Sequence, residues 1–230
     1  MTIRKAAAIA AFAAVLAFVT APGNRFALDD EMPEHGAGLY RPLVIVTFAA
    51  DWQLSGGSTV WLHAMNVAWH AATTALLVPV LAAYTGPAAA LAGGVLFAVH
   101  PVHVEAVANL VGRAELMAAA FLLAAVLLAR AVRHRRAEGR SSLLLEAAVL
   151  CAVALALLSK EHAAVAVAVL ALDDLATRPK GGAGLPWRTY AAVTALTAAW
   201  FVARRAVEGD VSFASVAPTF FGLGAIGRLS

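Results

Sequence analysis

Long apolar runs alternate with short polar stretches along the chain. The runs recur at spacings that fit bilayer-spanning helices, which need about 20 residues each. Two of the runs are short for a span, and each must borrow residues from the polar stretch beside it. We predict helices, with boundaries good to several residues, at residues 6–21, 60–83, 87–99, 116–129, 143–158, 163–172 and 190–203. The pattern therefore predicts an all-α fold, a polytopic transmembrane helical bundle of about seven spans.

The polar stretches divide the chain into four parts. Arg4 and Lys5 precede the first run, which reads equally as a transmembrane helix or a signal peptide. The acidic pair Asp29 and Asp30 lies in a mixed stretch that continues into an amphipathic segment reaching Leu54. We predict a first transmembrane helix or signal peptide at residues 1–21 and an external loop at 22–59. The transmembrane bundle follows at 60–205, and an external loop or truncated tail at 206–230.

Composition supports the membrane assignment and excludes some functions. The 230 residues are 62% hydrophobic and only 13% charged, against roughly 25% charged in soluble domains. The formal charge of +3 is small, and the basic residues gather in loops, so a nucleic-acid partner has no support. The single cysteine, Cys151, lies inside an apolar run and reads as a small apolar helix residue. The partner that the composition predicts is the lipid bilayer.

Lys and Arg in the loops predict the orientation, because cytoplasmic loops carry an excess of them. With a cytoplasmic N-terminus, three polar motifs meet on the extracytoplasmic face: Asp29–Asp30, the block from His100 to Glu115, and Ser159 to His162. We expect a protein of the bacterial inner membrane or an equivalent membrane, with its active face periplasmic or luminal. The cytoplasmic side then holds ten of the seventeen basic residues: Arg4, Lys5, Arg130, Arg133, Arg135, Arg136, Arg140, Arg178, Lys180 and Arg188.

The block from His100 to Glu115 concentrates polar chemistry in an otherwise apolar chain. Polar groups beside a membrane are costly unless they are paired, hydrated or functional, so the block is a candidate site. Its histidines and glutamates are ordinary zinc ligands, but Pro101 interrupts the helix that would present them together. We therefore expect no cofactor and do not favour a divalent metal. The expected pocket-lining residues here are His100, His103, Glu105, Asn109 and Glu115.

Arg113 and Lys160 are candidate ligands for a phosphate. An arginine at the start of a helix offers two donors and adjoining free backbone N–H groups to an anion. Lys160, at a facing helix end beside Glu161, would add a second positive charge. The structural alternative is that both cations only pair with neighbouring carboxylates and hold helices together.

His63, Asn66 and His70 follow one another at spacings of three and four residues and so share one stripe of a helix. A polar stripe on a membrane helix faces neighbouring helices rather than lipid. Hydrogen bonding between helices and lining of a site both remain open, and His63, nearest the outer end, is the candidate site residue.

Four motifs occur in an order that resembles a known family. They are Tyr40-Arg41-Pro42-Leu43, the His63 stripe, the His100–Glu115 block and Ser159-Lys160-Glu161. In this combination the chain resembles the transmembrane and tetratricopeptide-repeat-containing, O-mannosyltransferase-like proteins of the GT-C class and their bacterial relatives. The resemblance covers roughly residues 20 to 175. The 34-residue repeats of the family are not found, so we expect a fragment that lacks them.

The resemblance implies a GT-C-like helical fold with its site on the luminal or periplasmic side. It implies a polyprenyl-phosphate sugar donor, a protein or peptide acceptor, and inverting transfer of a mannose-like sugar to a Ser or Thr hydroxyl. An acidic residue of the first external loop is the catalytic base of that class, which here means Asp29 or Asp30. The chain departs from the family in having only nine residues between Asp30 and Tyr40 and no Asn-Pro after the acidic pair.

Two functions of different classes follow from these observations. The first is the glycosyltransferase, with Asp29 or Asp30 as base, Arg113 and Lys160 on the donor phosphate, and Glu161 among the pocket residues. The alternative is a membrane transporter or lipid-phosphate-binding subunit whose outward cavity binds an anion without chemistry.

Overall fold

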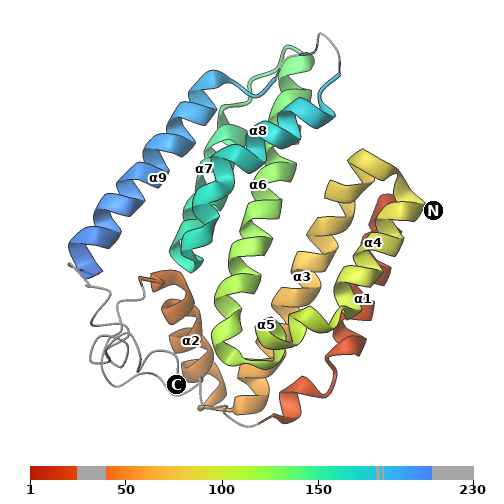
Figure 1. Cartoon of the computed structure of the whole chain (residues 1–230), viewed down its shortest axis with the longest axis vertical. Coiled ribbons are helices and arrows are strands. Elements are labelled where there is room, and N and C mark those ends of the chain that lie inside the picture. Colours follow the sequence, from red (N-terminus) through yellow and green to blue (C-terminus); the bar gives the residue numbers. More distant parts are fainter. Residues whose placement is uncertain (25–39, 180–181, 183, 209–230) are drawn as a thin grey trace, which may run out of the picture.

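Helices make up the fold of the described residues, which in this computed structural model are 1–24, 40–179, 182 and 184–208 (Figure 1). The predicted all-α fold is confirmed, since the described residues contain no strand. The helices are α1 Ile3–Ala17, α2 Pro42–Ser55, α3 Thr59–Thr85, α4 Pro87–Val99, α5 Val104–Ala108, α6 Arg113–Ala137, α7 Leu143–Ser159, α8 Ala166–Thr177 and α9 Trp187–Glu208. Short 3-10 turns are η1 Ala21–Gly23, η3 Pro101–His103, η4 Leu110–Gly112 and η5 Glu161–Val165.

The helices form two groups that meet along α3 and α6. Helices α1, α3 and α4 pack on one another, while α6 packs mainly on α7, and α7 and α8 contact α9 (Figure 1). The short α2 lies across the lower end of the bundle in that view, beside α7 and α3. Helix α6 begins at this lower end and α7 returns to it, so the residues that begin α6 and follow α7 come together.

Small residues let the first helical group pack closely, as the glycine and alanine content indicates. Ala6, Ala10 and Ala14 are fully buried along one face of α1. A Cβ added to Gly94 of α4 would lie 2.5 Å from Cγ2 of Val78 and 3.1 Å from Cβ of Ala10. Close backbone approach at small residues is a common way for membrane helices to associate.

Proline and the polar block break the path between α3 and α6. Helix α4 begins at Pro87 and ends at Val99, where Pro101 removes a backbone donor, and the chain bends by 48° into the short segment Pro101–Ala108. The link between α4 and α6 is thus a pair of 3-10 turns around the short helix α5. These turns carry the polar side chains of the block along the lower end of the bundle.

Three helical segments are long and apolar enough to cross a membrane: Ile3–Gly23, Thr59–Thr85 and Leu110–Ala137. The bent pair α4 and α5 brings the number to four if it counts as one span, and α7 is a shorter apolar helix. The chain is therefore an integral membrane protein. The described residues thus contain three or four candidate spans by length and composition. The total of about seven spans stays a prediction.

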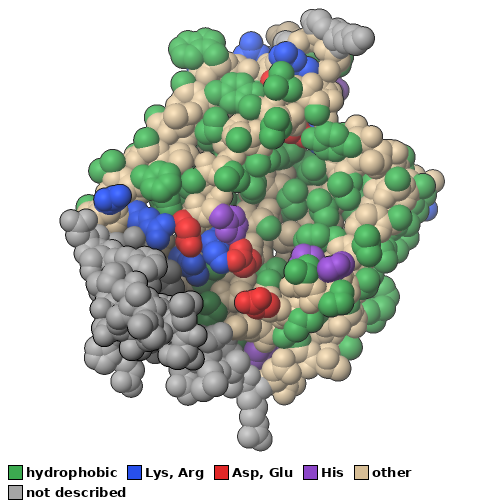
Figure 2. Space-filling view, viewed as in Figure 1, with side chains coloured by type: hydrophobic (Ala, Val, Ile, Leu, Met, Phe, Trp, Pro, Cys, Tyr) green, Lys and Arg blue, Asp and Glu red, His purple; other side chains and the backbone are tan. Residues whose placement is uncertain are grey.

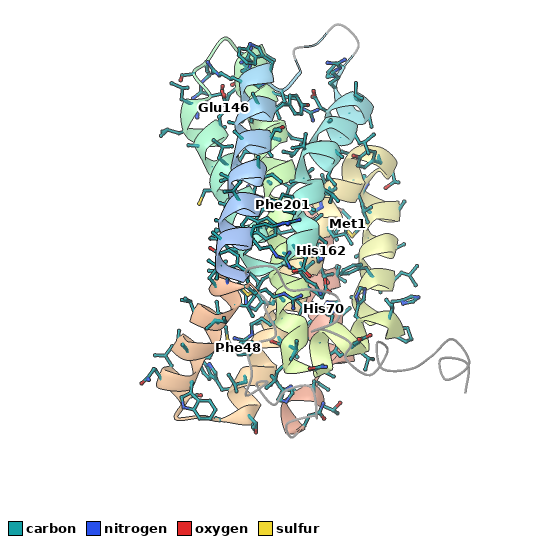
Figure 3. The ribbon with its side chains drawn as sticks, turned by 60° about the vertical axis from the view of Figure 1, so that its left-hand side comes forward. Met1, Phe48, His70, Glu146, His162 and Phe201 are labelled. Atoms are coloured by element: carbon teal, nitrogen blue, oxygen red, sulfur yellow. The ribbon has the colours of Figure 1, made fainter. Side chains whose placement is uncertain are left out.

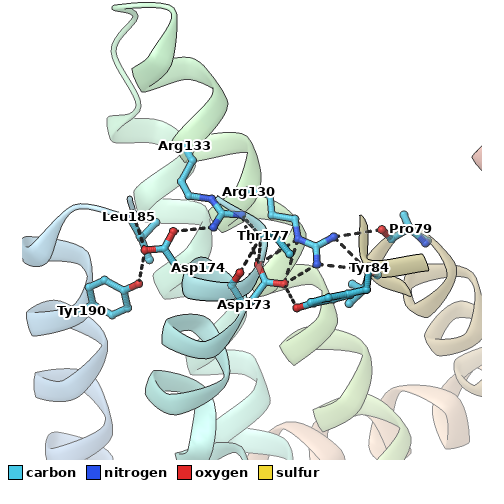
Figure 4. A network of polar contacts seen from close by, with 10 residues as sticks. Pro79, Tyr84, Arg130, Arg133, Asp173, Asp174, Thr177, Leu185 and Tyr190 are labelled. Atoms are coloured by element: carbon cyan, nitrogen blue, oxygen red, sulfur yellow. Dashed lines mark hydrogen bonds and ion pairs between the residues drawn. The ribbon is translucent and has the colours of Figure 1, made fainter. Parts of the chain in front are cut away.

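A network of arginines and aspartates ties the helices together at the end of the bundle away from α5 (Figure 4). Arg130 of α6 donates to Asp173 of α8 at 3.1 Å and to the carbonyl of Val80 in α3 at 3.2 Å. Arg133 pairs with Asp174 at 2.6 Å, and the Tyr190 hydroxyl of α9 donates to the same carboxylate at 3.0 Å. Four helices are thereby linked through two buried carboxylates.

Candidate active site

A cleft of about 570 Å³ opens at the end of the bundle where α6 begins. Acidic, basic and histidine side chains gather there, across the middle of a face that is otherwise mostly hydrophobic (Figure 2). The lining residues come from the start of α2, α3, the end of α4, the broken segment 101–112 between α4 and α6, the first turns of α6, and the junction of α7 with η5. The polar and charged residues among them are Arg41, Thr73, His103, Glu105, Asn109, Glu115, Lys160 and His162.

Ion pairs across the cleft join segments that are far apart in the sequence. Lys160, which follows α7, pairs with Glu115 in the first turn of α6, and Nδ1 of His162 lies 3.4 Å from the same carboxylate. Arg41, at the start of α2, pairs with Glu161 at 3.0 Å. These contacts bring α2, α6 and η5 to one place, so Glu115 of the His100–Glu115 block meets the Ser159–His162 motif there.

The two cations of the cleft are partly removed from water. Burial lowers the pKa of Lys160, and the charge of Arg41 lowers it further, whereas Glu161 and Glu105 act in the opposite direction. Burial alone would raise the pKa of Glu161, but the hydrogen bonds and charge of Arg41, a backbone hydrogen bond and the charge of Arg204 together lower it. The two positive side chains are paired with carboxylates. An incoming anion can bind them either by displacing the carboxylates or by sharing the cations with them.

Arg113, a candidate phosphate ligand from the sequence, does not line this cleft. Its side chain is fully buried, Nε donates to Oδ1 of Asn66 at 2.9 Å, and one terminal nitrogen donates to the Leu62 carbonyl at 2.9 Å. The other terminal nitrogen pairs with Asp51. Because the guanidinium is engaged and covered, it cannot also hold a donor phosphate in this arrangement, and its carboxylate is neither Glu105 nor Glu115.

The stripe on α3 makes contacts between helices. Asn66 donates to the carbonyl of Asn109 at 3.0 Å while its oxygen accepts from Arg113. Nε2 of His70 lies 3.0 Å from the carbonyl of Ala98. His63 is fully buried and is not among the described residues that line the cleft. Asn66 and His70 therefore make the contacts between helices that the structural interpretation of the stripe predicts, and His63 does not line the cleft.

The predicted residues of the broken segment have separate positions. Nδ1 of His100 accepts from the backbone N–H of Val102, which caps η3, and the residue is exposed outside the cleft. His103 lines the cleft, with its ring 4.2 Å from that of Phe97 between centroids. The side chain of Asn109 caps η4 through the N–H of Val111. The block thus combines local turn-forming contacts with residues that face the cleft.

Figure 3 places Glu146 near one end of the bundle, His70 and Phe48 toward the other, and His162 between them. The pairing of Lys160 with Glu115 places both beside the start of α6, whereas Arg133 lies near the end of that helix with Asp174. Asp29 and Asp30, the predicted bases, lie outside the described residues.

The described residues contain no group of three His, Cys, Asp or Glu side chains placed to hold a metal ion. The Lys160, His162 and Glu115 cluster has one carboxylate, and its lysine is a poor ligand while protonated. The absence of a metal from the mechanism remains an expectation.

Two residues of the cleft, Arg41 and His162, are not candidate site residues from the sequence pattern, and neither is Asp51, the partner of Arg113 outside the cleft. The signal for Arg41 is its position before Pro42, which puts a cation at the start of a helix. His162 directly follows Lys160 and Glu161. A buried arginine needs a carboxylate partner, and the predicted external loop at residues 22–59 contains Asp51. This requirement of Arg113 is the signal in the sequence that points to Asp51.

Comparison with known proteins gives close sequence matches to one group. Tmtc2 of Drosophila melanogaster, a protein O-mannosyl-transferase, is 39% identical over 141 residues, which are 60% of this chain and 15% of the fly protein. Human TMTC4, of the same description, is 39% identical over 119 residues, covering 45% of this chain and 16% of the relative. The chain is a relative of the TMTC proteins. The resemblance inferred from the motifs is thereby confirmed.

This TMTC-like chain corresponds to a small part of those relatives. Mouse TMTC3 is 39% identical over 88 residues, which are 38% of this chain and 10% of the mouse protein. The chain therefore spans a sixth or less of the length of these three proteins. No family model and no solved structure matches it.

Proposed function

We propose that this TMTC-like chain carries the donor site of a membrane glycosyltransferase that moves a mannose-like sugar from a polyprenyl phosphate to a protein Ser or Thr hydroxyl. The single observation that carries the proposal is the cleft, where Arg41 and Lys160 lie among carboxylates and histidines at one end of an apolar bundle. The names of the relatives, protein O-mannosyl-transferases, support the reaction class.

The cleft suits a lipid-linked donor because its wall is of two kinds. Glu115, Lys160 and His162 supply charged or polar surface, and Phe97, Val102 and Leu116 supply apolar surface. A sugar phosphate attached to an isoprenoid chain needs both kinds of surface at the edge of a bilayer. We place the donor phosphate at Arg41 and Lys160, whereas the sequence alone predicts that Arg113 and Lys160 bind it.

The reaction is a single displacement at the anomeric carbon. The acceptor hydroxyl oxygen forms a bond to that carbon while the bond from the carbon to the phosphate oxygen breaks. The hydroxyl proton passes to Asp29 or Asp30, and the electron pair of the broken bond leaves with the polyprenyl phosphate. A positioned general base contributes about 10²–10⁴ in rate, and a contact that stabilises the developing charge contributes about 10²–10³.

We place the cleft on the extracytoplasmic side and the N-terminus in the cytoplasm. The arginines from Arg130 to Arg140 lie toward the far end of α6 from the cleft or in the turn that follows it, and cytoplasmic loops carry an excess of Lys and Arg. The acceptor would then be a protein or peptide on the periplasmic or luminal side.

The experiment supplies the purified protein, in lipid nanodiscs, with polyprenyl-phosphate mannose and a Ser/Thr peptide and measures mannosyl-peptide formation. We expect the double variant Asp29→Asn/Asp30→Asn to lose about 10²–10⁴ in kcat and Lys160→Met to lose about 10²–10³. Arg136→Met, which removes an exposed arginine near the other end of α6, is the matched control and should keep wild-type activity. We also expect full activity in a chelator.

Two results would redirect the proposal. Unchanged turnover after both aspartates are replaced excludes them as the base. Tight binding of polyprenyl phosphate with no transfer to any peptide supports the alternative, a lipid-phosphate-binding subunit or transporter.

A further inference from the structure

Arg113 lies where three helices meet, although it is the first residue of α6. Its side chain has no exposed surface, and its nitrogens bind Asn66 and Leu62 of α3 and Asp51 of α2. The guanidinium also stacks over the ring of Phe48 of α2, 3.9 Å from the centroid. One buried cation therefore connects α2 to both α3 and α6.

Asp51, like Arg113, is buried and hydrogen-bonded to more than one partner. Its second oxygen accepts from the indole N–H of Trp61 at 3.2 Å, and its side chain is 9% exposed. A buried pair that loses one partner leaves the other charge uncompensated, which is strongly unfavourable. The pair therefore resists separation of α2 from α3 and α6.

The opposite end of α2 carries Arg41, which lines the cleft and pairs with Glu161. Arg41 and Asp51 are ten positions apart, which in a helix corresponds to about 15 Å along the axis. Because a helix of this length is stiff, the position of Asp51 sets the position of Arg41. Apolar packing of Val44 with Ala114 and Met117 supports the same docking between the two ends.

We infer that Arg113 is a positioning residue, which fastens α2 through Asp51 and Phe48 so that Arg41 is presented to the anion-binding cleft. This assigns to Arg113 a role outside the lining of the cleft. The inference about the cleft rests on the proposed function, whereas the placement of α2 can be tested without it.

The first test measures the placement of α2 by cross-linking. Cysteines replace Arg41 and Glu161 in a Cys151→Ala background, and a short bifunctional thiol-reactive reagent, a bis-methanethiosulfonate, joins the two thiols in membranes with loss of a sulfinate from each end. Arg113→Met should lower the rate of cross-linking at least about tenfold, because the buried pair is broken. Arg130→Met breaks a buried arginine–aspartate pair on the same helix near the other end and should leave the rate unchanged.

Asp51→Asn removes the charge with little change of shape and keeps the test decisive if Arg113→Met does not fold. It should lower the cross-linking rate in the same direction. A wild-type rate in either folded variant overturns the inference.

The second test asks whether Arg113 acts through Arg41. The dissociation constant of polyprenyl phosphate is measured for Arg41→Met, Arg113→Met and the double variant. We expect both single variants to weaken binding by a similar factor and the double variant to bind no more weakly than Arg41→Met, since coupled residues are not additive. Multiplied effects in the double variant overturn the link to the cleft.

The two tests separate failure of the inference from failure of the proposed function. If the wild-type protein does not bind polyprenyl phosphate, the proposed donor is wrong. The cross-linking rates still decide whether Arg113 places α2.

Discussion

Replacement of Gly112 by alanine tests how tightly the broken segment is folded against α6. Gly112 ends η4, and an added Cβ would lie 2.3 Å from the carbonyl oxygen of Ala106 and 2.6 Å from its carbonyl carbon. Ordinary van der Waals contact begins at 3.4 Å, so the backbone of α5 must move by about 1 Å to restore optimal separation. Overpacking of this kind costs about 1–3 kcal/mol.

A cost of this size is measurable as a change in thermal stability. For a chain of this length, about 1–3 kcal/mol corresponds to a Tm lower by roughly 2–12 °C. The assay is thermal unfolding of the purified protein in one detergent, followed by circular dichroism. Gly23→Ala is the control, because no atom lies within 4 Å of its added Cβ, and we expect a change within about 0.5 kcal/mol.

Equal Tm values for Gly112→Ala and Gly23→Ala would refute the reasoning. That result would mean that α5 yields to a methyl group at no cost, and that the turn before Arg113 is not held by close backbone contact.

Two further predictions concern ion pairs. Asp173→Asn should lower the stability by up to about 3 kcal/mol, because Arg130 loses its buried carboxylate. Glu138→Gln, the control, breaks an exposed pair with Arg140 and should cost under about 1 kcal/mol in the same unfolding assay. Equal losses of stability in the two variants would contradict this prediction. The Arg41–Glu161 pair lowers the pKa of Glu161 below 4.5, so it stabilises the fold above that pH and its contribution is lost as the pH falls through the lowered pKa. Because Glu161 is 35% exposed, the contribution should be under about 1 kcal/mol, and Arg41→Met should show a smaller fall in Tm between pH 6 and pH 3 than wild type; an identical fall would exclude the pair as its cause.

The helices themselves were largely predictable from local pattern. The run predicted at residues 87–99 is the helix Pro87–Val99, and the run at 143–158 is Leu143–Ser159. Proline and the end of apolar character mark these boundaries within the sequence. Helix α6 extends further than its apolar run on both sides, from Arg113 to Ala137, because Arg113 is neutralised inside the bundle and the last turns carry arginines.

The partners of the charged residues were not predictable. Arg113 pairs with Asp51, 62 residues earlier, rather than with a nearby glutamate. Arg41 reaches Glu161 across 120 residues, and Lys160 reaches Glu115 across 45. Which carboxylate pairs with each cation depends on which helix faces pack together. The sequence pattern offers several carboxylates on the same side of the membrane and does not distinguish among them.

The sequence by itself determined that this is an integral membrane protein of helices, related to the TMTC proteins, with a polar block between two apolar runs. Bilayer length, helix periodicity and proline chemistry are local properties, so a single chain displays them directly. Only the tertiary structure decided that Arg113 is buried against α2 and that Arg41 and Lys160 are the cations of the cleft. The reason is that a charge in an apolar bundle is stable only where packing supplies its partner, and packing joins residues that no local pattern connects.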